Sequence, residues 1–266
     1  MSSRTETFQL ARDQADVYES RFVPAIFAQW ASPLVDAAGV GPGHHVLDVG
    51  CGTGILARTA ADRVAPSGRV VGLDLNEGML AVARRLRPDL EWRRGDAADL
   101  PFADETFDAV LCQSALMFFP DPSRALAEMA RVSRTAGTVG VQVYASLDAQ
   151  PAYRPWVEMV AKQAGAEALS LLGTYWVHGD VDALGLRFAA ADLEIIDVIR
   201  RAGTARWSSV DEMVGVEIAA TPLAERISDA LRQRILEESR VLLAAYTTES
   251  GAEVPLVSHL VVARKH

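Results

Sequence analysis

The sequence is poor in cysteine, in basic residues relative to acidic ones, and in long apolar runs. Its two cysteines, Cys51 and Cys112, are too few for a disulfide framework or a cysteine-rich metal centre. Lys and Arg number 26 against 35 Asp and Glu, and the resulting net charge of −9 disfavours a nucleic-acid or anionic-membrane partner. No run approaches the roughly 18 apolar residues of a membrane span, and the first residues carry no apolar signal core. We therefore expect a cytoplasmic globular protein without membrane insertion.

The composition is that of a chain able to bury a sizeable core. Half of the 266 residues are hydrophobic and 23% are charged. No internal repeat or linker-like tract divides the chain. We predict an N-terminal helical segment over residues 1–42 and a core over 43–145. Residues 146–266 are expected to continue the same domain, with a helical cap at about 205–250 and a closing strand at 257–263.

Helical spacing dominates the first forty residues. Val23, Phe27, Trp30 and Leu34 recur three or four residues apart, which places them on one helical face. Pro24 is predicted to start this helix and to separate it from a shorter one over residues 12–20.

Residues 43–145 alternate short apolar runs with amphipathic stretches. The expected strands are Val46–Val49, Arg69–Leu73, Leu90–Arg94, Phe107–Cys112 and Thr138–Tyr144, and the expected helices are Ile55–Val64, Glu77–Arg87 and Pro122–Val132. Strands that alternate with helices predict a parallel sheet covered by helices on both faces. The fold class is therefore α/β.

The last 120 residues are less regular. We expect a helix at Tyr153–Gln163 and a strand at Leu193–Arg200. Thr221 and Pro222 are predicted to start one long helix whose apolar residues are four apart, from Leu223 to Ile235. That stripe is most simply a buried helix face, and a lid or a homodimer contact is the alternative.

The strongest chemical signal is a glycine-rich loop between a strand and a helix. Gly50, Gly52 and Gly54 occupy alternate positions, and glycine is needed where backbone turns tightly or approaches a ligand. Asp74 ends the next strand, where a carboxylate can accept both hydroxyls of a ribose. The third glycine comes one residue earlier than in a dinucleotide fingerprint, and Asp48 precedes the loop. A carboxylate there suits a cationic ligand better than a pyrophosphate, which weakens a nicotinamide interpretation.

Residues 43–144 resemble the class I S-adenosylmethionine-dependent methyltransferases, closest to the small-molecule branch of ubiquinone and menaquinone biosynthesis. The motifs that carry the resemblance are Asp48–Gly54, Val71–Leu80, Gly95–Phe102 leading to Phe107–Val110, and Phe119–Pro122 before a helix ending in Glu128–Val132. The resemblance implies a Rossmann-like, mostly parallel seven-stranded sheet with a helical cap, and S-adenosylmethionine as cofactor.

The resemblance also implies which residues bind the cofactor. They are Tyr18, Asp48, Gly50, Gly52, Gly54, Asp74, Leu75, Met79, Asp96, Ala97 and Gln113. Leu75 and Met79 would flank the adenine, Asp96 would accept from its amino group, and the Ala97 N–H would meet a ring nitrogen. Gln113 would face the ligand ammonium through its backbone carbonyl. A core methionine and a turn aspartate are the alternatives for Met79 and Asp96.

An aromatic side chain in the N-terminal helix can face the sulfonium, as cation–π attraction allows. Tyr18 and Phe22 are the candidates, with ordinary helix packing as the alternative. Trp156, Tyr175, Trp176 and Trp207 are candidates for an acceptor pocket, again with packing as the alternative.

The implied reaction is an in-line methyl transfer, in which the protein acts mainly by positioning. A hydroxyl acceptor would need a general base, and His178 is the weak candidate for it. Met117 and Phe118 stand where the family often has a polar residue, which suggests an apolar wall. Cys51 and Cys112 are expected to be structural, since no cationic residue adjoins them.

We conclude from the sequence that the chain is a methyltransferase acting on a small-molecule acceptor. Two alternatives stay open at this point. One is a protein that binds S-adenosylmethionine without transferring its methyl group, and the other is a nicotinamide-dependent oxidoreductase.

Overall fold

The computed structural model describes residues 12–219 and 221–265, which form two compact units. Unit 1 holds the residues up to Val143, the segment Val181–Arg200 and the residues from His259 on, and unit 2 holds Tyr144–Asp180 and Arg201–Ser258. All residues of the predicted cap, 205–250, belong to unit 2. Within the described ranges, no helix is both long enough and apolar enough to cross a membrane.

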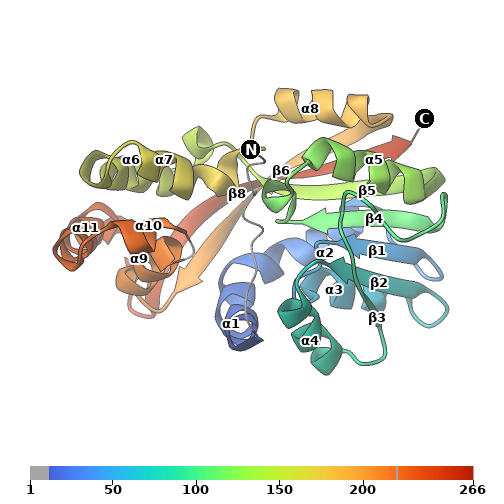
Figure 1. Cartoon of the computed structure of the whole chain (residues 1–266), viewed down its shortest axis with the longest axis horizontal. Helices are drawn as coiled ribbons and strands as arrows, with labels where there is room; N and C mark the ends of the chain where they lie inside the picture. Colours follow the sequence, from blue (N-terminus) through green and yellow to red (C-terminus); the bar gives the residue numbers. More distant parts are fainter. Residues whose placement is uncertain (1–11, 220, 266) are drawn as a thin grey trace, which may run out of the picture. The chain divides into compact units, whose positions relative to one another are not determined.

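A mostly parallel sheet organises unit 1 (Figure 1). Its strands, in spatial order, are β3 (Glu91–Arg94), β2 (Arg69–Asp74), β1 (His45–Val49), β4 (Phe107–Gln113), β5 (Ser133–Tyr144), β8 (Gly251–Lys265) and β6 (Leu193–Trp207). β1 pairs in parallel with both β2 and β4, and β3 and β5 extend the parallel part. A two-residue strand, β7 (Thr247–Thr248), pairs antiparallel with β8 in unit 2. The predicted α/β, Rossmann-like sheet is confirmed.

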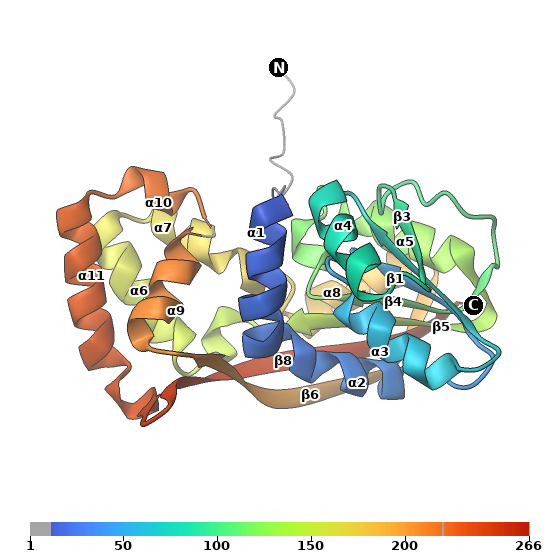
Figure 2. The same ribbon diagram turned by 90° about the horizontal axis from the view of Figure 1, so that it is seen from below.

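The two faces of the sheet are covered by different helices, because successive side chains of a strand point to opposite faces. On β1, Leu47 and Val49 join a buried cluster with residues of α5 (Pro122–Val132) and α8 (Val181–Ala190). Val46 joins a second cluster, formed with α2 (Ala28–Ala37), α3 (Ile55–Val64) and α4 (Glu77–Leu86). Figure 2 shows α2 and α3 side by side.

Helix caps fix where the strands give way to helices. The Asn76 side chain accepts a hydrogen bond from the Met79 N–H and begins α4. The Asp121 side chain accepts from the Arg124 N–H, with Pro122 in the first turn of α5. Both caps lie in motifs that the sequence singled out, and both expected helices are confirmed.

The N-terminal helices differ from the prediction. α1 (Arg12–Val17) continues without a break into a π-helical segment, η1 (Tyr18–Phe27), and then into α2. Pro24 lies inside η1 rather than at a helix start, so that prediction is wrong. Proline lacks the N–H of a helical ladder and clashes with the preceding turn, and a wider π-type turn accommodates it.

Unit 2 is mainly helical. Its helices are α6 (Tyr153–Ala164), α7 (Glu167–Leu172), α9 (Val210–Ala219), α10 (Leu223–Arg226) and α11 (Asp229–Leu242). The predicted long helix from Pro222 is wrong, because it is divided into α10 and α11 at Ile227. The Ser228 side chain accepts from the Leu231 N–H and so begins a new helix. Trp156 donates from Nε1 to the Ser239 hydroxyl at 3.0 Å, which joins α6 to α11.

Short 3-10 turns connect the elements. They are η2 (Leu116–Phe118), η3 (Leu147–Ala149), η4 (Gly173–Trp176) and η5 (Ala244–Tyr246).

Candidate functional site

The glycine loop follows β1 at the carboxyl edge of the sheet. Strand order reverses between β1 and β4, and ligands of open α/β sheets bind in the crevice at such a switch point. The loop is anchored to the neighbouring strand, since the N–H groups of Gly50 and Cys51 both donate to the Leu73 carbonyl, at 2.8 and 3.0 Å.

The three glycines of the loop have positive φ but different surroundings. A Cβ on Gly54 would lie 2.3 Å from the Trp92 ring, and one on Gly50 would lie 2.6 Å from the Ala115 Cβ. These two positions therefore require glycine for close packing as well as for conformation. A Cβ on Gly52 would meet nothing nearer than the Tyr18 hydroxyl, at 3.8 Å. Gly52 is thus the one of these three glycines at which a Cβ would make only ordinary van der Waals contact, with Tyr18.

Asp74 joins the end of β2 to the glycine loop. Its Oδ2 accepts a hydrogen bond from the Gly52 N–H at 2.8 Å, and its Oδ1 accepts from the Asn76 N–H at 2.8 Å. Burial raises the pKa of this carboxyl, although these backbone donors oppose the shift. Each carboxylate oxygen keeps a second lone pair, so Asp74 can hold the loop and still accept from a ligand hydroxyl.

Asp48 is deeply buried, and its carboxylate binds backbone of the protein itself. Its side chain is 1% exposed, and its Oδ2 accepts from the Ala57 N–H in the first turn of α3, at 2.9 Å. Burial, with a smaller contribution from Asp74, raises the pKa of Asp48 to about 7. The geometry makes Asp48 a link between β1 and α3.

The same surroundings keep the two thiols neutral. Cys51 and Cys112 are free and buried, and burial together with the charge of Asp48 raises the pKa of both. Neither thiol is a nucleophile near neutral pH, because the thiolate is the reactive form. The expectation that both are structural is confirmed.

Three unsatisfied polar atoms lie at the same edge of the sheet. They are the hydroxyl of Thr53 after β1, Nδ2 of Asn76 after β2, and Oε1 of Gln113 at the end of β4, all buried and without a hydrogen-bond partner among the described residues. Gln113 still donates from Nε2 to the Phe27 carbonyl at 3.0 Å. Buried polar groups are nearly always paired, so this concentration points to a polar ligand.

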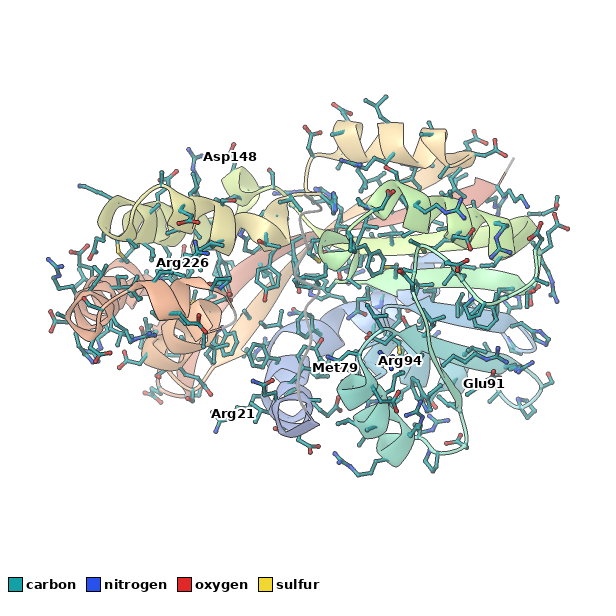
Figure 3. The ribbon with its side chains drawn as sticks, in the orientation of Figure 1. Arg21, Met79, Glu91, Arg94, Asp148 and Arg226 are labelled. Carbon is teal, nitrogen blue, oxygen red and sulfur yellow. The ribbon has the colours of Figure 1, made fainter. Side chains whose placement is uncertain are left out.

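The N-terminal helical segment lies against the loop. Tyr18 stacks on Phe22 and Phe27, with ring centroids 5.9 and 5.3 Å apart, and its hydroxyl lies near Gly52. Met79, labelled in Figure 3, packs in a small buried cluster with residues of α1 and α4, against which Tyr18 lies. The aromatic predicted to face the ligand is therefore beside the loop.

An ion pair that the sequence did not indicate holds this segment in place. Arg58 on α3 pairs with Glu19 at 2.8 Å, and it also donates to the Thr53 carbonyl at 3.2 Å. The side chains of Arg58 and Glu19 are 17% and 20% exposed. One guanidinium thus connects η1, α3 and the glycine loop.

Asp96 forms a turn in the segment that follows β3. Its Oδ1 accepts from the Ala98 N–H at 2.9 Å, which is the turn geometry considered as its alternative role. The carboxylate is exposed, so its second oxygen can still accept from a ligand. Ala97 is buried, whereas Leu75 is 37% exposed and Met79 only 5%.

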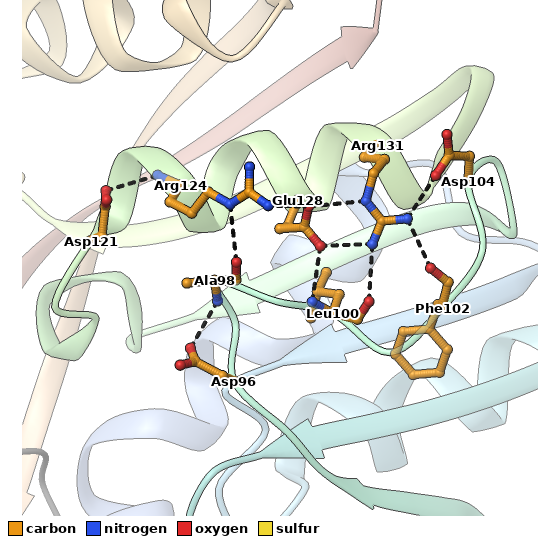
Figure 4. A network of polar contacts seen from close by, with 9 residues as sticks. All are labelled: Asp96, Ala98, Leu100, Phe102, Asp104, Asp121, Arg124, Glu128 and Arg131. Atoms are coloured by element: carbon orange, nitrogen blue, oxygen red, sulfur yellow. Dashed lines mark hydrogen bonds and ion pairs between the residues drawn. The ribbon is translucent and has the colours of Figure 1, made fainter.

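Two charged residues of α5 hold the segment that carries Asp96 (Figure 4). Glu128 accepts from the Leu100 N–H at 2.9 Å and pairs with Arg131 at 2.7 Å. Arg131 in turn donates to the carbonyls of Leu100 and Phe102, at 3.0 and 2.8 Å. The Glu128–Val132 motif therefore holds the loop that follows Asp96, and the spacing of its charges three residues apart on one helical face is the signal that could have shown this.

The remaining predictions concern the acceptor. The segment after β4 is apolar, with Met117 buried and Phe119 packed against Gly50, as expected from the sequence. His178 belongs to unit 2, where it is half-buried, and its role as a base stays a prediction.

Known methyltransferases are similar to this chain in sequence and in structure. Residues 47–141 match the family model described as a methyltransferase domain. A ubiquinone/menaquinone biosynthesis C-methyltransferase of Bordetella avium is 32% identical over 202 residues, which cover 71% of this chain and 79% of that protein. A demethylmenaquinone methyltransferase of Renibacterium salmoninarum is 45% identical over 113 residues, which cover 42% of this chain and 46% of that protein. The chain spans about half the length of several curated relatives that it matches.

Solved structures show the same fold. The phosphoethanolamine N-methyltransferase 2 of Haemonchus contortus has a TM-score of 0.60 at 18% identity, over 96% of this chain and 57% of that one. At this identity the likeness concerns the fold alone.

Proposed function

Because the chain belongs to the class I S-adenosylmethionine-dependent methyltransferases of the ubiquinone and menaquinone type, we propose that it transfers a methyl group to a small-molecule acceptor. The observation that carries the proposal is the uncrowded backbone at Gly52, next to Asp74 and to buried polar atoms that lack partners among the described residues. A polar ligand that offers an acceptor to Asn76 Nδ2 and a donor to Gln113 Oε1 would satisfy those atoms.

The residues present fit S-adenosylmethionine. Gly52 gives the methionine part of the cofactor close access to backbone. The side-chain Oε1 of Gln113, rather than the backbone carbonyl expected from the sequence, is the buried acceptor without a partner among the described residues that is available to the ligand ammonium. Asp74 takes the ribose, and the Asp96 carboxylate takes the adenine amino group. Tyr18 covers the loop, where its ring can face a sulfonium. Asp48 supports this arrangement indirectly, through α3.

The chain contributes positioning rather than covalent chemistry. When bound, the cofactor supplies the methyl group together with its own leaving group, a sulfonium. The buried Cys51 and Cys112 thiols are protonated and do not compete as nucleophiles. The apolar segment Leu116–Phe119 excludes water, so that an acceptor held in line meets few competing groups.

Several relatives are named for methylating quinone precursors, which supports an acceptor with an apolar or aromatic body. The apolar segment after β4 agrees with that class. A homodimer and a cytoplasmic location remain expectations from the sequence.

The test is the formation of S-adenosylhomocysteine with a panel of acceptors. The purified chain is incubated with S-adenosylmethionine and with a reduced quinone, a phenol or an arylamine, and the product is counted over time. Acceptor-dependent product is expected from the wild type, with a much lower rate from Asp74→Asn. Tight cofactor binding without product from any acceptor would instead favour the alternative of a binding protein that does not transfer methyl.

A further inference from the structure

We propose that Glu217, Tyr153 and the aromatic side chains beside them bind a protonated amine, at a site formed by unit 2 alone. All of these residues lie within unit 2. None of them belongs to a motif of the family, and Glu217 has no counterpart among the site residues predicted from the sequence.

Glu217 is a carboxylate on the buried face of a helix. It lies on α9, three and four residues from Val214 and Met213, which are both fully buried, and it is itself 9% exposed. The Tyr153 hydroxyl donates to Glu217 Oε1 at 3.1 Å. Among the residues that the structure describes, no cationic side chain pairs with it, and no hydrogen bond reaches Oε2. A buried carboxylate is costly unless a cation or a proton compensates it.

A cluster of aromatic rings adjoins this carboxyl through Tyr153. The Tyr153 and Trp176 centroids are 5.2 Å apart, Tyr144 lies 5.5 Å from Trp176, and Tyr175 lies 6.3 Å from Trp176. Burial raises the pKa of the Tyr175 phenol, and the charge of Glu217 adds a smaller contribution in the same direction. Trp176 is 7% exposed, and its indole N–H is buried with no partner among the described side chains.

A buried carboxylate next to aromatic rings favours a cationic ligand over a neutral polar one. Ring faces carry negative potential and attract an ammonium group, especially where water is excluded. Burial raises the pKa of Glu217 to about 7, and the hydrogen bond from Tyr153 only partly opposes this shift. An ammonium at hydrogen-bond distance would favour the ionised form and would supply the missing counter-charge. An alcohol would leave that charge uncompensated.

The experiment compares two probes of equal size on the full chain. Isothermal titration measures the affinity for 2-phenylethylamine, which is protonated at pH about 8, and for 2-phenylethanol. We expect the amine to bind at least about tenfold more tightly, as a charge-assisted contact requires. Glu217→Gln should abolish this preference, while Glu238→Gln, an exposed residue of α11, should keep it.

The results that would contradict the amine site can be told apart from those that would contradict the proposed methyl transfer. Equal affinities for the two probes, or binding of neither, would overturn the inference, and this wild-type comparison needs no variant to fold. A folded Glu217→Gln protein that keeps the preference would overturn it too. S-adenosylhomocysteine is titrated into the same samples. Its binding without an amine preference refutes the amine site alone, whereas its failure to bind refutes the proposed function.

Discussion

Gly52 and Gly54 stand two residues apart in one loop but meet different surroundings. The Trp92 ring occupies the space that a Cβ of Gly54 would need. The absence of a side chain at Gly54 therefore lets α3 pack closely against β3. A Cβ on Gly52 would make only ordinary contact with Tyr18, and the Gly52 N–H donates to Asp74. Gly54 is therefore needed for packing, and we propose that Gly52 serves the ligand.

We predict different effects for alanine at these two positions. Gly54→Ala should lower the free energy of unfolding by about 3 kcal/mol or more, because overpacking adds to the strain of a positive φ. Gly52→Ala should cost only about 1–2 kcal/mol from its positive φ, yet weaken S-adenosylhomocysteine binding. Denaturant melts and calorimetric titration measure the two quantities. Equal loss of stability in both variants would contradict this division.

Asp74 is the side chain with the most direct predicted effect on affinity. Asp74→Asn keeps the shape but removes the charge that strengthens hydrogen bonds from the Gly52 N–H and from the ribose. Affinity for S-adenosylhomocysteine should fall about 10- to 100-fold, or roughly 1–3 kcal/mol. Asp62→Asn, on the exposed face of α3, is the matched control and should bind as the wild type does. Unchanged affinity in folded Asp74→Asn would remove Asp74 from the site.

Among the elements, α5 is a helix whose charged residues act on a neighbouring loop. Arg131 alone donates to two carbonyls of the segment after Asp96 and also pairs with Asp104 at 2.7 Å. Its guanidinium is 31% exposed, whereas the Glu128 side chain is 4% exposed. Burial of one partner makes this network worth more than a surface ion pair.

Removal of the guanidinium should therefore loosen the loop without unfolding the sheet. Arg131→Met is expected to cost about 2–3 kcal/mol, since it removes the shorter of two ion pairs of the buried Glu128 carboxylate and leaves the longer one to Arg124, at 3.3 Å. Hydrogen exchange of amides 98–104 should accelerate, while the amides of β1 and β4 stay protected. The control is Arg84→Met, which removes a surface pair with Glu77 and should leave that loop unchanged. Uniform acceleration across the sheet would show that Arg131 supports the whole unit instead.

The elements between residues 43 and 144 follow from sequence because local signals agree there with tertiary packing. Helix caps such as Asn76 and Asp121, and apolar runs such as Val46–Val49, point to the same boundaries as the sheet does. Pro24 shows the limit of such reasoning, because a π-type turn absorbs a residue that ordinarily ends a helix. The apolar residues from Leu223 to Ile235 are regularly spaced, so their pattern alone does not reveal that Ser228 caps a new helix.

The site was only partly predictable for a related reason. The loop glycines and Asp74 are visible as a motif, but their separate tasks depend on Trp92 and Tyr18, which are distant in sequence. Glu217 was overlooked although a polar residue at a core-facing helical position is itself a signal. Glu217 lies four residues after Met213, and this spacing places both residues on one face of α9.

At the scale of the whole molecule, two buried acids make the stability of the fold depend on pH. Asp48 has a folded-state pKa of about 7 against an ordinary value of 3.8, so between these values the folded chain binds more protons than the unfolded chain. The free energy of unfolding therefore falls as pH rises through this window. Glu217 acts in the same direction, because its pKa is also raised to about 7.

Asp48→Asn is expected to flatten that dependence. From about pH 5 to about pH 7, the wild type should lose up to about 1.4 kcal/mol per pH unit through this one group. The difference between variant and wild type isolates Asp48 from histidines and from other carboxylates. Denaturant melts at a series of pH values give the two slopes. Parallel slopes would show that Asp48 is ionised in the folded protein well below pH 7.

The central claim is that the loop of unit 1 binds S-adenosylmethionine and not a dinucleotide. Thermal unfolding with S-adenosylmethionine, S-adenosylhomocysteine, NAD and NADP, each added alone, tests it most directly. A ligand at 100 times its Kd adds about 2.7 kcal/mol of stability, which corresponds to a shift in Tm of roughly 5 °C or more. We predict that shift with the two adenosyl sulfur ligands only. A shift with NAD or NADP, or none with S-adenosylhomocysteine, would contradict the claim.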